Sequence, residues 1–208
     1  MDFGAPLFLF LYLPVFLGIY YVSGRRGRVA VGIVGSLLFY AWGNLTFLPL
    51  LLGILGVAYG CGWGIQRWQG TRVASSLVWL GVLVNVGVLV GFKLWDVEKY
   101  PLGLSYITFQ ALAYLFEVNG GKVEREGNVF FFAFYLLFFP KLPVGPIVRY
   151  SQVRDQIHDL QVQPDDVAEG LRRSIVGFAK KALIADTLAK TVNPVFELSS
   201  PAIAPGLA

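Results

Sequence analysis

The chain has 208 residues, of which 56% are hydrophobic and only 14% are charged, with a formal net charge of +4. Soluble domains carry about 25% charged residues, whereas the first 92 residues here contain only six charges: Asp2, Arg25, Arg26, Arg28, Arg67 and Arg72. This distribution excludes a cytosolic enzyme, a secreted domain held together by disulfide bonds and a disordered tail, and it predicts membrane helices. The single cysteine, Cys61, excludes an intrachain disulfide.

Uncharged stretches predict the first membrane-embedded helices, because about 20 apolar residues cross about 30 Å of hydrocarbon. Phe3–Val22 forms the first, and the arginines that follow it have the wrong polarity for a cleaved signal peptide. Residues 29–66 are too long for one span, so we expect a hairpin that turns at Ala41–Asn44 and has a short first arm. Val73–Phe92 forms the next span.

The positive charges predict the orientation of these helices. A hairpin over residues 29–66 brings the Arg25–Arg28 cluster and the Arg67/Arg72 pair to the same side, and the positive-inside rule makes that side cytoplasmic. The N-terminus is then extracytoplasmic. The loop 93–99, whose charges cancel, is expected on the same outer side.

Two features inside the spans predict contacts between helices. Gly56, Gly60 and Gly64 recur every four residues and form one stripe on a helix, which favours close backbone approach between helices in lipid. Asn85 lies in the middle of a span, where an interhelical hydrogen bond is favoured over a substrate contact.

Two segments depart from simple spans and carry the polar groups of a candidate site. In the first, an apolar helix over Pro101–Phe116 carries Ser105, Thr108 and Gln110. Ser105 and Thr108 lie one turn apart on the same face. Polar side chains at membrane depth face protein or a water-filled cavity, so helix packing and a cavity wall are both open interpretations. A polar loop, Glu117–Asn128, follows.

The second segment is Phe130–Tyr150, in which Lys141 is the only charge before Arg149. Its three prolines remove three amide donors and cannot all lie inside one regular helix. Irregular backbone at membrane depth is stable only when it is buried in protein or lines water, so we expect a re-entrant or interfacial loop. Lys141 and Arg149 would either hold an anionic group there by charge-assisted hydrogen bonds or extend to lipid phosphates.

Beyond Pro164 the spacing of apolar residues predicts an amphipathic helix that stops at Asn193–Pro194. Its apolar face is formed by Leu171, Ile175, Phe178, Ala182, Ala185, Ala189 and Val192. Its other side carries Arg172, Arg173, Lys180, Lys181 and Lys190. This pattern is typical of a helix that lies on an anionic cytoplasmic leaflet, and docking of an acidic carrier protein is the alternative.

Motifs distributed over residues 3–190 resemble the membrane-bound O-acyltransferase family, especially its bacterial alginate O-acetylation branch. They are LFLFLYLP at 7–14, FYAW at 39–42, GLSYITFQ at 103–110, FPKLPVGPIVR at 139–149 and GFAKKALIAD at 177–186. The resemblance implies a ring of membrane helices around a tunnel in which a cytosolic acyl donor meets an extracytoplasmic hydroxyl acceptor. Glu117 and Asn119 depart from the family pattern, which usually has Asp and an aromatic residue there.

The resemblance also implies a catalytic histidine on an apolar helix late in the chain, and this sequence has none there. Its sole histidine, His158, lies in a polar stretch and is interpreted as an ordinary interfacial residue. The sequence contains no nucleophile–base pair, metal-ligand cluster, phosphate loop or carboxylate dyad. We therefore assign no catalytic residue and no metal ligand, and we expect the chain to be inactive alone because related proteins continue beyond the position of Ala208.

The predicted fold is an all-α, polytopic membrane bundle of about five embedded helices, with a re-entrant segment and a cytoplasmic amphipathic helix. Residues 1–208 are expected to form a single membrane domain, the N-terminal half of a longer acyltransferase fold. Within it, residues 1–92 form apolar spans, 93–150 carry the motif-bearing helix and the proline-broken segment, and 151–208 form the amphipathic helix and tail.

The expected function is half of a bacterial inner-membrane enzyme that moves an acyl group, with acetyl favoured, onto hydroxyls of an exopolysaccharide such as alginate. Lys141 and Arg149 would hold an anion, and Ser105, Thr108 and Gln110 would line the tunnel. The donor, acyl-CoA or an acyl carrier, is a substrate, and no bound cofactor is expected. Expected partners are the lipid bilayer, polysaccharide acetylation or export proteins and an acyl-carrier protein, but no nucleic acid. The alternative is a non-catalytic membrane scaffold or a transporter-like half.

Overall fold

The computed structural model describes residues 5–94, 100–142, 145–161 and 163–199. Within these ranges the chain is helical and contains no strand, in agreement with the predicted all-α class. The chain divides into two compact units, Met1–Gln161 and Val162–Ala208. The hydrophobic core of the described residues lies in the first unit, which also holds both segments of the predicted site.

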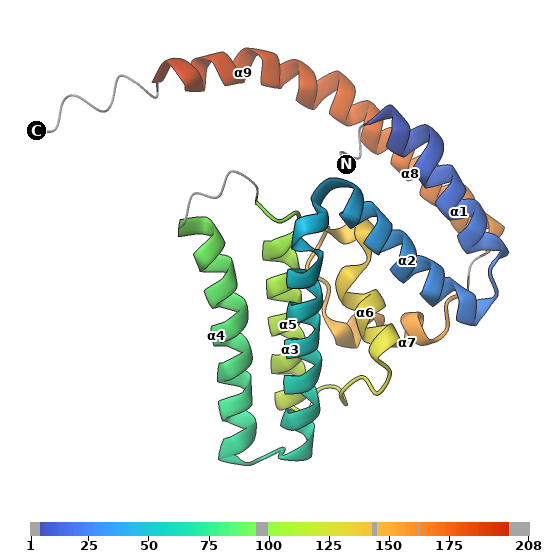
Figure 1. Ribbon diagram of the computed structural model, residues 1–208. Helices are drawn as coiled ribbons and strands as arrows, with labels where there is room; N and C mark the ends of the chain where they lie inside the picture. Colours follow the sequence, from blue (N-terminus) through green and yellow to red (C-terminus); the bar gives the residue numbers. More distant parts are fainter. Residues whose placement is uncertain (1–4, 95–99, 143–144, 162, 200–208) are drawn as a thin grey trace, which may run out of the picture. The chain divides into compact units, whose positions relative to one another are not determined.

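Two antiparallel helices open the first unit (Figure 1). A π-helical turn, Phe8–Tyr12, leads directly into α1, Leu13–Val22, and α2 spans Arg25–Asn44. The helices separate at Ser23 and Gly24, whose extended backbone interrupts the helical hydrogen bonding. The first apolar stretch of the sequence is therefore paired with the second.

The chain breaks after α2, close to the turn predicted within residues 29–66, but α2 packs mainly against α6 (Val129–Leu137) and α1 and touches the next long helix, α3, little. The 3₁₀ turn Leu45–Phe47 directly follows the predicted turn at Ala41–Asn44, and α3 then spans Leu48–Arg67. Pro49 lies in the first turn of α3, where a missing amide donor costs no helical hydrogen bond. α2 has 20 residues, but its first turn holds the arginine cluster, and its apolar part, Gly27–Gly43, is shorter than a membrane span, which agrees with the predicted short first arm.

The helices α3, α4 and α5 lie side by side in a bundle (Figure 1). α4 spans Arg72–Leu94, which agrees with the predicted span to within two residues, and α5 spans Leu104–Asn119. Two helices of the described chain are long and apolar enough to cross a membrane, Leu45–Arg67 and Arg72–Leu94. Most of the loop 93–99, predicted to be neutral and external, lies outside the described residues.

Close packing in this bundle involves one glycine of the predicted stripe and two others. At Gly56 and Gly60 a Cβ atom would have no neighbour within 4 Å, whereas at Gly64 it would lie 2.6 Å from Leu77 in α4. At Gly62 it would lie 2.8 Å from the ring of Tyr114, and at Gly81 it would lie 2.4 Å from Leu115. The period of four residues therefore identified a close contact at Gly64 but not at the other two positions of the stripe.

Asn85 also differs from the expectation. Its side chain is fully buried in α4, and its amide donates to the carbonyl of Gly81 in the same helix at 2.7 Å. Its Oδ1 atom is buried without a hydrogen-bond partner among the described residues. The predicted interhelical hydrogen bond is therefore absent from the described part of the chain.

The polar loop after α5 leads into a short helix and an irregular return. α6 spans Val129–Leu137 and is followed by a 3₁₀ turn, Phe139–Lys141. Asn128 caps α6, because its Oδ1 accepts the N–H two residues further on at 2.9 Å. Residues 145–149 have no regular secondary structure, and α7 spans Tyr150–His158. The proline-containing segment is thus broken, as predicted, although residues 143 and 144 lie outside the described residues.

The 3₁₀ turn is buried against the beginning of α5 and the middle of α2. Phe139 is 2% exposed, and its N–H donates to Oγ of Ser36 at 3.0 Å. Gly103 has a φ of +70°, and a Cβ there would lie 2.6 Å from the carbonyl oxygen of Leu142. Glycine is required at this position because it allows both the left-handed backbone and the close contact.

The second unit differs in two ways from the predicted amphipathic helix. It contains α8, Pro164–Lys180, a π-helical turn, Lys181–Ala185, and α9, Asp186–Ser199. The helix continues through Pro194, because one proline removes only one backbone hydrogen bond. The π turn adds one residue and rotates the following side chains by about 100°. The apolar face predicted for residues 171–192 therefore does not continue directly from α8 into α9.

Candidate functional site

The predicted site residues on α5 lie in a packed interface. Thr108 is fully buried, and its hydroxyl has no hydrogen-bond partner among the described residues. Gln110 is 3% exposed, and its Nε2 donates to the carbonyl of Tyr135 in α6 at 3.0 Å. Ser105 is half-buried, with its hydroxyl 3.2 Å from that of Tyr100. Gln110 therefore connects α5 to α6, and the tunnel-wall role of all three residues stays a prediction.

Lys141 and Arg149 lie at different places in the segment between α6 and α7. Lys141 ends the 3₁₀ turn, half-buried, with its ammonium nitrogen 5.4 Å from the centroid of the Tyr135 ring, a cation–π contact. Arg149 is exposed immediately before α7, and its N–H donates to Oε1 of Gln152 at 3.3 Å. No hydrogen bond or ion pair joins the two cations to each other or to a described carboxylate, so their anion-holding role also stays a prediction.

A buried carboxylate, Glu126, gathers polar groups from three elements. It is 4% exposed and belongs to the loop between α5 and α6. Its Oε1 accepts the N–H of Asn128 at 2.8 Å. Its Oε2 accepts the hydroxyl of Tyr150 and lies 2.7 Å from Nε2 of His158. The N–H of Glu126 itself donates to the hydroxyl of Tyr114 at 3.0 Å.

A second buried carboxylate, Glu117, holds the start of α7. It is 6% exposed, near the end of α5, and accepts both the hydroxyl of Ser151 at 2.5 Å and its N–H at 3.1 Å. The hydroxyl of Tyr135 donates to the carbonyl of Val148 at 2.9 Å, just before α7. The chain leaves this end of the bundle in α6, and these hydrogen bonds show that it returns to the same end at the start of α7.

The hydrogen bonds around Glu126 set its charge. Burial acts to raise the pKa of this carboxyl, but hydrogen bonds from Tyr150, Asn128 and His158 outweigh it and hold the pKa below its usual value. Burial, and then the neighbouring carboxylate, raise the pKa of Tyr150. At neutral pH the carboxylate is thus ionised and the phenol protonated. Because an ionised carboxylate only accepts hydrogen bonds, Nε2 of His158 carries a proton.

Sequence reasoning gave Glu126 no role and interpreted His158 as an ordinary interfacial residue. His158 is in fact the last residue of α7, its ring centroid is 4.4 Å from that of Phe131, and its side chain is 42% exposed. One indication was present in the sequence: Glu126 lies two residues before Asn128, which directly precedes an apolar helix. That pattern predicts a helix start, but no sequence pattern indicates that Tyr150 and His158 share its carboxylate.

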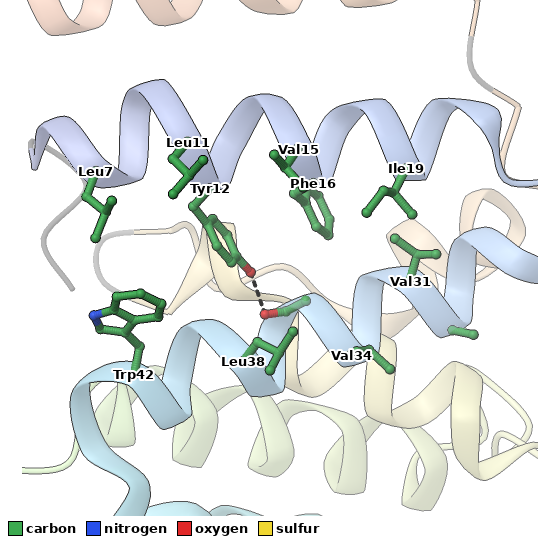
Figure 2. A pocket seen from close by; sticks show the side chains of 12 residues that line it. Leu7, Leu11, Tyr12, Val15, Phe16, Ile19, Val31, Val34, Leu38 and Trp42 are labelled. Atoms are coloured by element: carbon green, nitrogen blue, oxygen red, sulfur yellow. Dashed lines mark hydrogen bonds between the residues drawn. The ribbon is translucent and has the colours of Figure 1, made fainter.

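Two cavities lie next to α2. Figure 2 shows an apolar groove of about 500 Å³ between α1 and α2, into which Leu11 and Val34 project from opposite sides. The hydroxyl of Tyr12 crosses it and donates to the carbonyl of Gly35 at 2.5 Å (Figure 2). The groove brings together no acid, base or metal ligand.

The other cavity, of about 510 Å³, lies between α2, α6 and α7. Its lining consists of Val29, Ala30, Asn128, Phe130, Phe131, Ile157 and His158. Within the described ranges, no three His, Cys, Asp or Glu side chains gather in a way that could hold a metal ion. The described residues at this end of the bundle offer hydrogen bonding and charge.

Comparison with known proteins places nearly the whole chain in one group. It is 35% identical to a probable alginate O-acetylase of Pseudomonas aeruginosa over 97% of this chain and 43% of the relative. It is 29% identical to a peptidoglycan O-acetyltransferase of Helicobacter pylori, covering 90% of this chain and 45% of the relative. A teichoic acid D-alanyltransferase of Bacillus subtilis is 26% identical over 76% of this chain and 45% of the relative.

The chain thus spans less than half the length of each of these relatives. No family model matches the sequence, and no solved structure matches it. The group expected from the motifs at 103–110 and 139–149 is nevertheless the one that the relatives identify, with the alginate O-acetylases more similar than the others. Over nearly its whole length the chain is thus similar to proteins named as alginate O-acetylases, in agreement with the expected resemblance.

Proposed function

We propose that this chain forms half of a membrane enzyme that moves an acyl group, with acetyl favoured, from a cytosolic donor onto hydroxyls of an exopolysaccharide such as alginate. The observation that carries the proposal is the 35% identity to an alginate O-acetylase over 97% of the chain. The other relatives are named as transferases that modify peptidoglycan and teichoic acid, which are also cell-envelope polymers. An acceptor on the far side of a membrane from its donor explains why such chemistry needs an embedded protein.

The arrangement of charged ends supports a multi-pass orientation with the N-terminus outside. Nη1 of Arg28, near the start of α2, donates to the carbonyl of Leu160 just after α7, at 2.6 Å. A Cβ on Gly121, in the loop after α5, would lie 3.2 Å from the amide of Gln69, which follows α3. The arginine-bearing ends of α2 and α3 therefore lie at the end of the bundle that carries the polar loop. By the positive-inside rule this end faces the cytoplasm.

The path of the segment between Asn128 and Tyr150 supports a re-entrant interpretation. α6 has nine residues and is about 14 Å long, less than half of the roughly 30 Å of hydrocarbon. Both ends of the segment meet at Glu126, on the proposed cytoplasmic side. In this arrangement Lys141 lies near the deepest point and Arg149 at the cytoplasmic end, where each would hold an anionic group of the donor.

No general base is assigned to the chain, so we propose that it needs the remaining length found in its relatives. The test replaces the aligned region of the P. aeruginosa acetylase by this chain in an alginate-producing strain that lacks the acetylase. The acetyl content of the alginate is measured by NMR, and this chain alone is expressed in parallel. We expect acetylation with the chimera and none with the chain alone.

Two outcomes would contradict the proposal in different ways. A chimera that accumulates in the membrane at the level of the intact acetylase, but leaves alginate without acetyl groups, would reject the acyl-transfer role and favour the scaffold. Acetylation by the chain alone would reject the need for the remaining length. For orientation, topology reporters fused after Arg28 and after Arg72 should both report cytoplasm, and opposite signals would reject the hairpin placement.

A further inference from the structure

The segment between Asn128 and Tyr150 leaves the bundle end and returns to it, and one carboxylate joins its two ends. Glu126 accepts the N–H of Asn128 at the outgoing end and the hydroxyl of Tyr150 at the returning end. His158, at the other end of α7, adds a donor to the same Oε2 atom, at 2.7 Å. We call Glu126, Tyr150 and His158 the carboxylate clasp.

The apex of the segment is held mainly by packing. The ring centroid of Phe139 lies 5.0 Å from that of Phe16 and 5.2 Å from that of Phe39, and its N–H donates to Ser36. Hydrogen bonds to ionised groups are roughly twice as strong as neutral ones, and they are found at the ends of the segment. The position of Lys141, which follows Phe139 by two residues, therefore depends on the closure of the ends together with the packing of the apex.

The clasp is enclosed on one side and accessible on the other. Glu126 and Tyr150 are at most 4% exposed, whereas the side chain of His158 is 42% exposed and lies over Phe131. His158 thus completes the closure from the exposed side, as a donor to a buried, ionised carboxylate.

Other charges surround the clasp from each packed element and do not replace Glu126. Arg154 pairs with Glu124 at 3.8 Å, on the exposed side of the loop, and Arg28 is engaged with the carbonyl of Leu160. Other charged or titratable groups at this end of the bundle include Tyr59, Tyr114, Glu117, Lys122 and Arg125, together with Asp155 in α7 and Asp159 directly after it.

We propose that Glu126 is a positioning residue which, through Tyr150 and His158, closes the segment between Asn128 and Tyr150 and fixes the depth of Lys141. The inference rests on the proposed function for its consequence, because the depth of Lys141 matters only if that residue meets a donor. The closure itself is a property of the chain and is testable without activity.

The test is hydrogen–deuterium exchange of the full chain in lipid nanodiscs. Glu126→Gln should raise exchange in α6 and α7 by about tenfold or more, because it removes a charged acceptor of three donors. α3 and α4 should be unchanged. The matched control is Glu124→Gln, in the same loop but 77% exposed and bound by one long ion pair. Equal exchange in the two variants would overturn the proposal.

A second pair of variants covers the case in which Glu126→Gln unfolds the whole bundle. Tyr150→Phe removes one donor and leaves the carboxylate, and it should raise exchange in α6 and α7 by a few-fold. His158→Phe removes the other side-chain donor, keeps a ring against Phe131, and should raise exchange in the same helices. Unaltered protection in both variants would reject the clasp.

Acetylation by the chimera separates the two proposals. If the wild-type chimera acetylates alginate, Glu126→Gln should lower the rate by about tenfold or more and Glu124→Gln should not. Full activity in Glu126→Gln, despite faster exchange, would remove the positioning role. An inactive wild-type chimera would reject the proposed function while the exchange data still decide whether the closure exists.

Discussion

The bundle of α3, α4 and α5 and the segment between Asn128 and Tyr150 both contribute to the hydrophobic core, but the forces that hold them differ. In the bundle, apolar side chains pack against glycines at contacts such as Gly81 with Leu115. In the segment, apolar packing is joined by polar fixed points at the ends: Glu126 with Tyr150, and Glu117 with Ser151. Apolar packing is spread over many weak contacts, whereas these polar points are few and strong, so we expect single substitutions to act differently in the two regions.

The largest effect is expected in the bundle. Gly81→Leu places a side chain where even a Cβ would lie 2.4 Å from Leu115, and overpacking of this kind should lower the free energy of unfolding by about 3 kcal/mol. Gly56→Leu, where a Cβ meets nothing within 4 Å, is the control and should cause no loss. The measurement is unfolding in mixed detergent micelles followed by circular dichroism. Equal losses in both variants would mean that close glycine contacts do not hold the bundle.

The hydrogen bond from Gln110 in α5 to α6 joins the two regions, and its loss should have a smaller effect on stability. Gln110→Leu removes the donor to the carbonyl of Tyr135 and leaves that buried oxygen unpaired, which should cost about 1–2 kcal/mol in the same unfolding assay. Gln156→Leu, on the exposed side of α7, is the matched control. If Gln110→Leu were as stable as the wild type, the amide would not be needed to join α5 to α6, and the interpretation of Gln110 as part of a cavity wall would be favoured.

The cations of the returning segment should affect transfer and not stability. Lys141→Met and Arg149→Met in the chimera should each lower the acetylation rate by about tenfold, because each removes a charge-assisted contact to an anionic donor group. Membrane accumulation should be unaltered, and Lys122→Met, in the loop after α5, is the control. Wild-type turnover in both variants would remove the anion-holding role.

The smallest effect is the expected loss of stability at low pH. The folded state holds the pKa of Glu126 below its usual value. The stability that the ionised carboxylate contributes is therefore fully present above the pKa of an unfolded Glu, about 4.3, and is lost as the pH falls through the lowered pKa of the folded state. Protection of α6 and α7 should therefore decline in strong acid before that of α3 and α4. Glu126→Gln should abolish this difference, and a wild-type segment insensitive to acid would argue that the carboxyl is not ionised in the fold.

Sequence patterns anticipated the elements of both regions better than their contacts. The uncharged run 73–92 predicted α4 within two residues, and the turn in residues 29–66 was placed next to the observed 3₁₀ turn. The glycine period in α3 indicated one close contact, at Gly64, and missed Gly62, since a period identifies a stripe but not its neighbour. The helix stop at Pro194 was wrong because one lost hydrogen bond does not end a helix whose other bonds remain.

The sequence by itself determined the resemblance to alginate O-acetylases, the all-α class and the breaks in the chain, because these follow from composition, local hydrogen-bonding capacity and ordered motifs. It also located the polar groups on α5 and in the proline-containing segment. Only the tertiary structure decided that Glu126 meets Tyr150 and His158, residues 24 and 32 positions away. A hydrogen bond acts over about 3 Å in space, and no local pattern encodes which distant donor the fold brings within that distance.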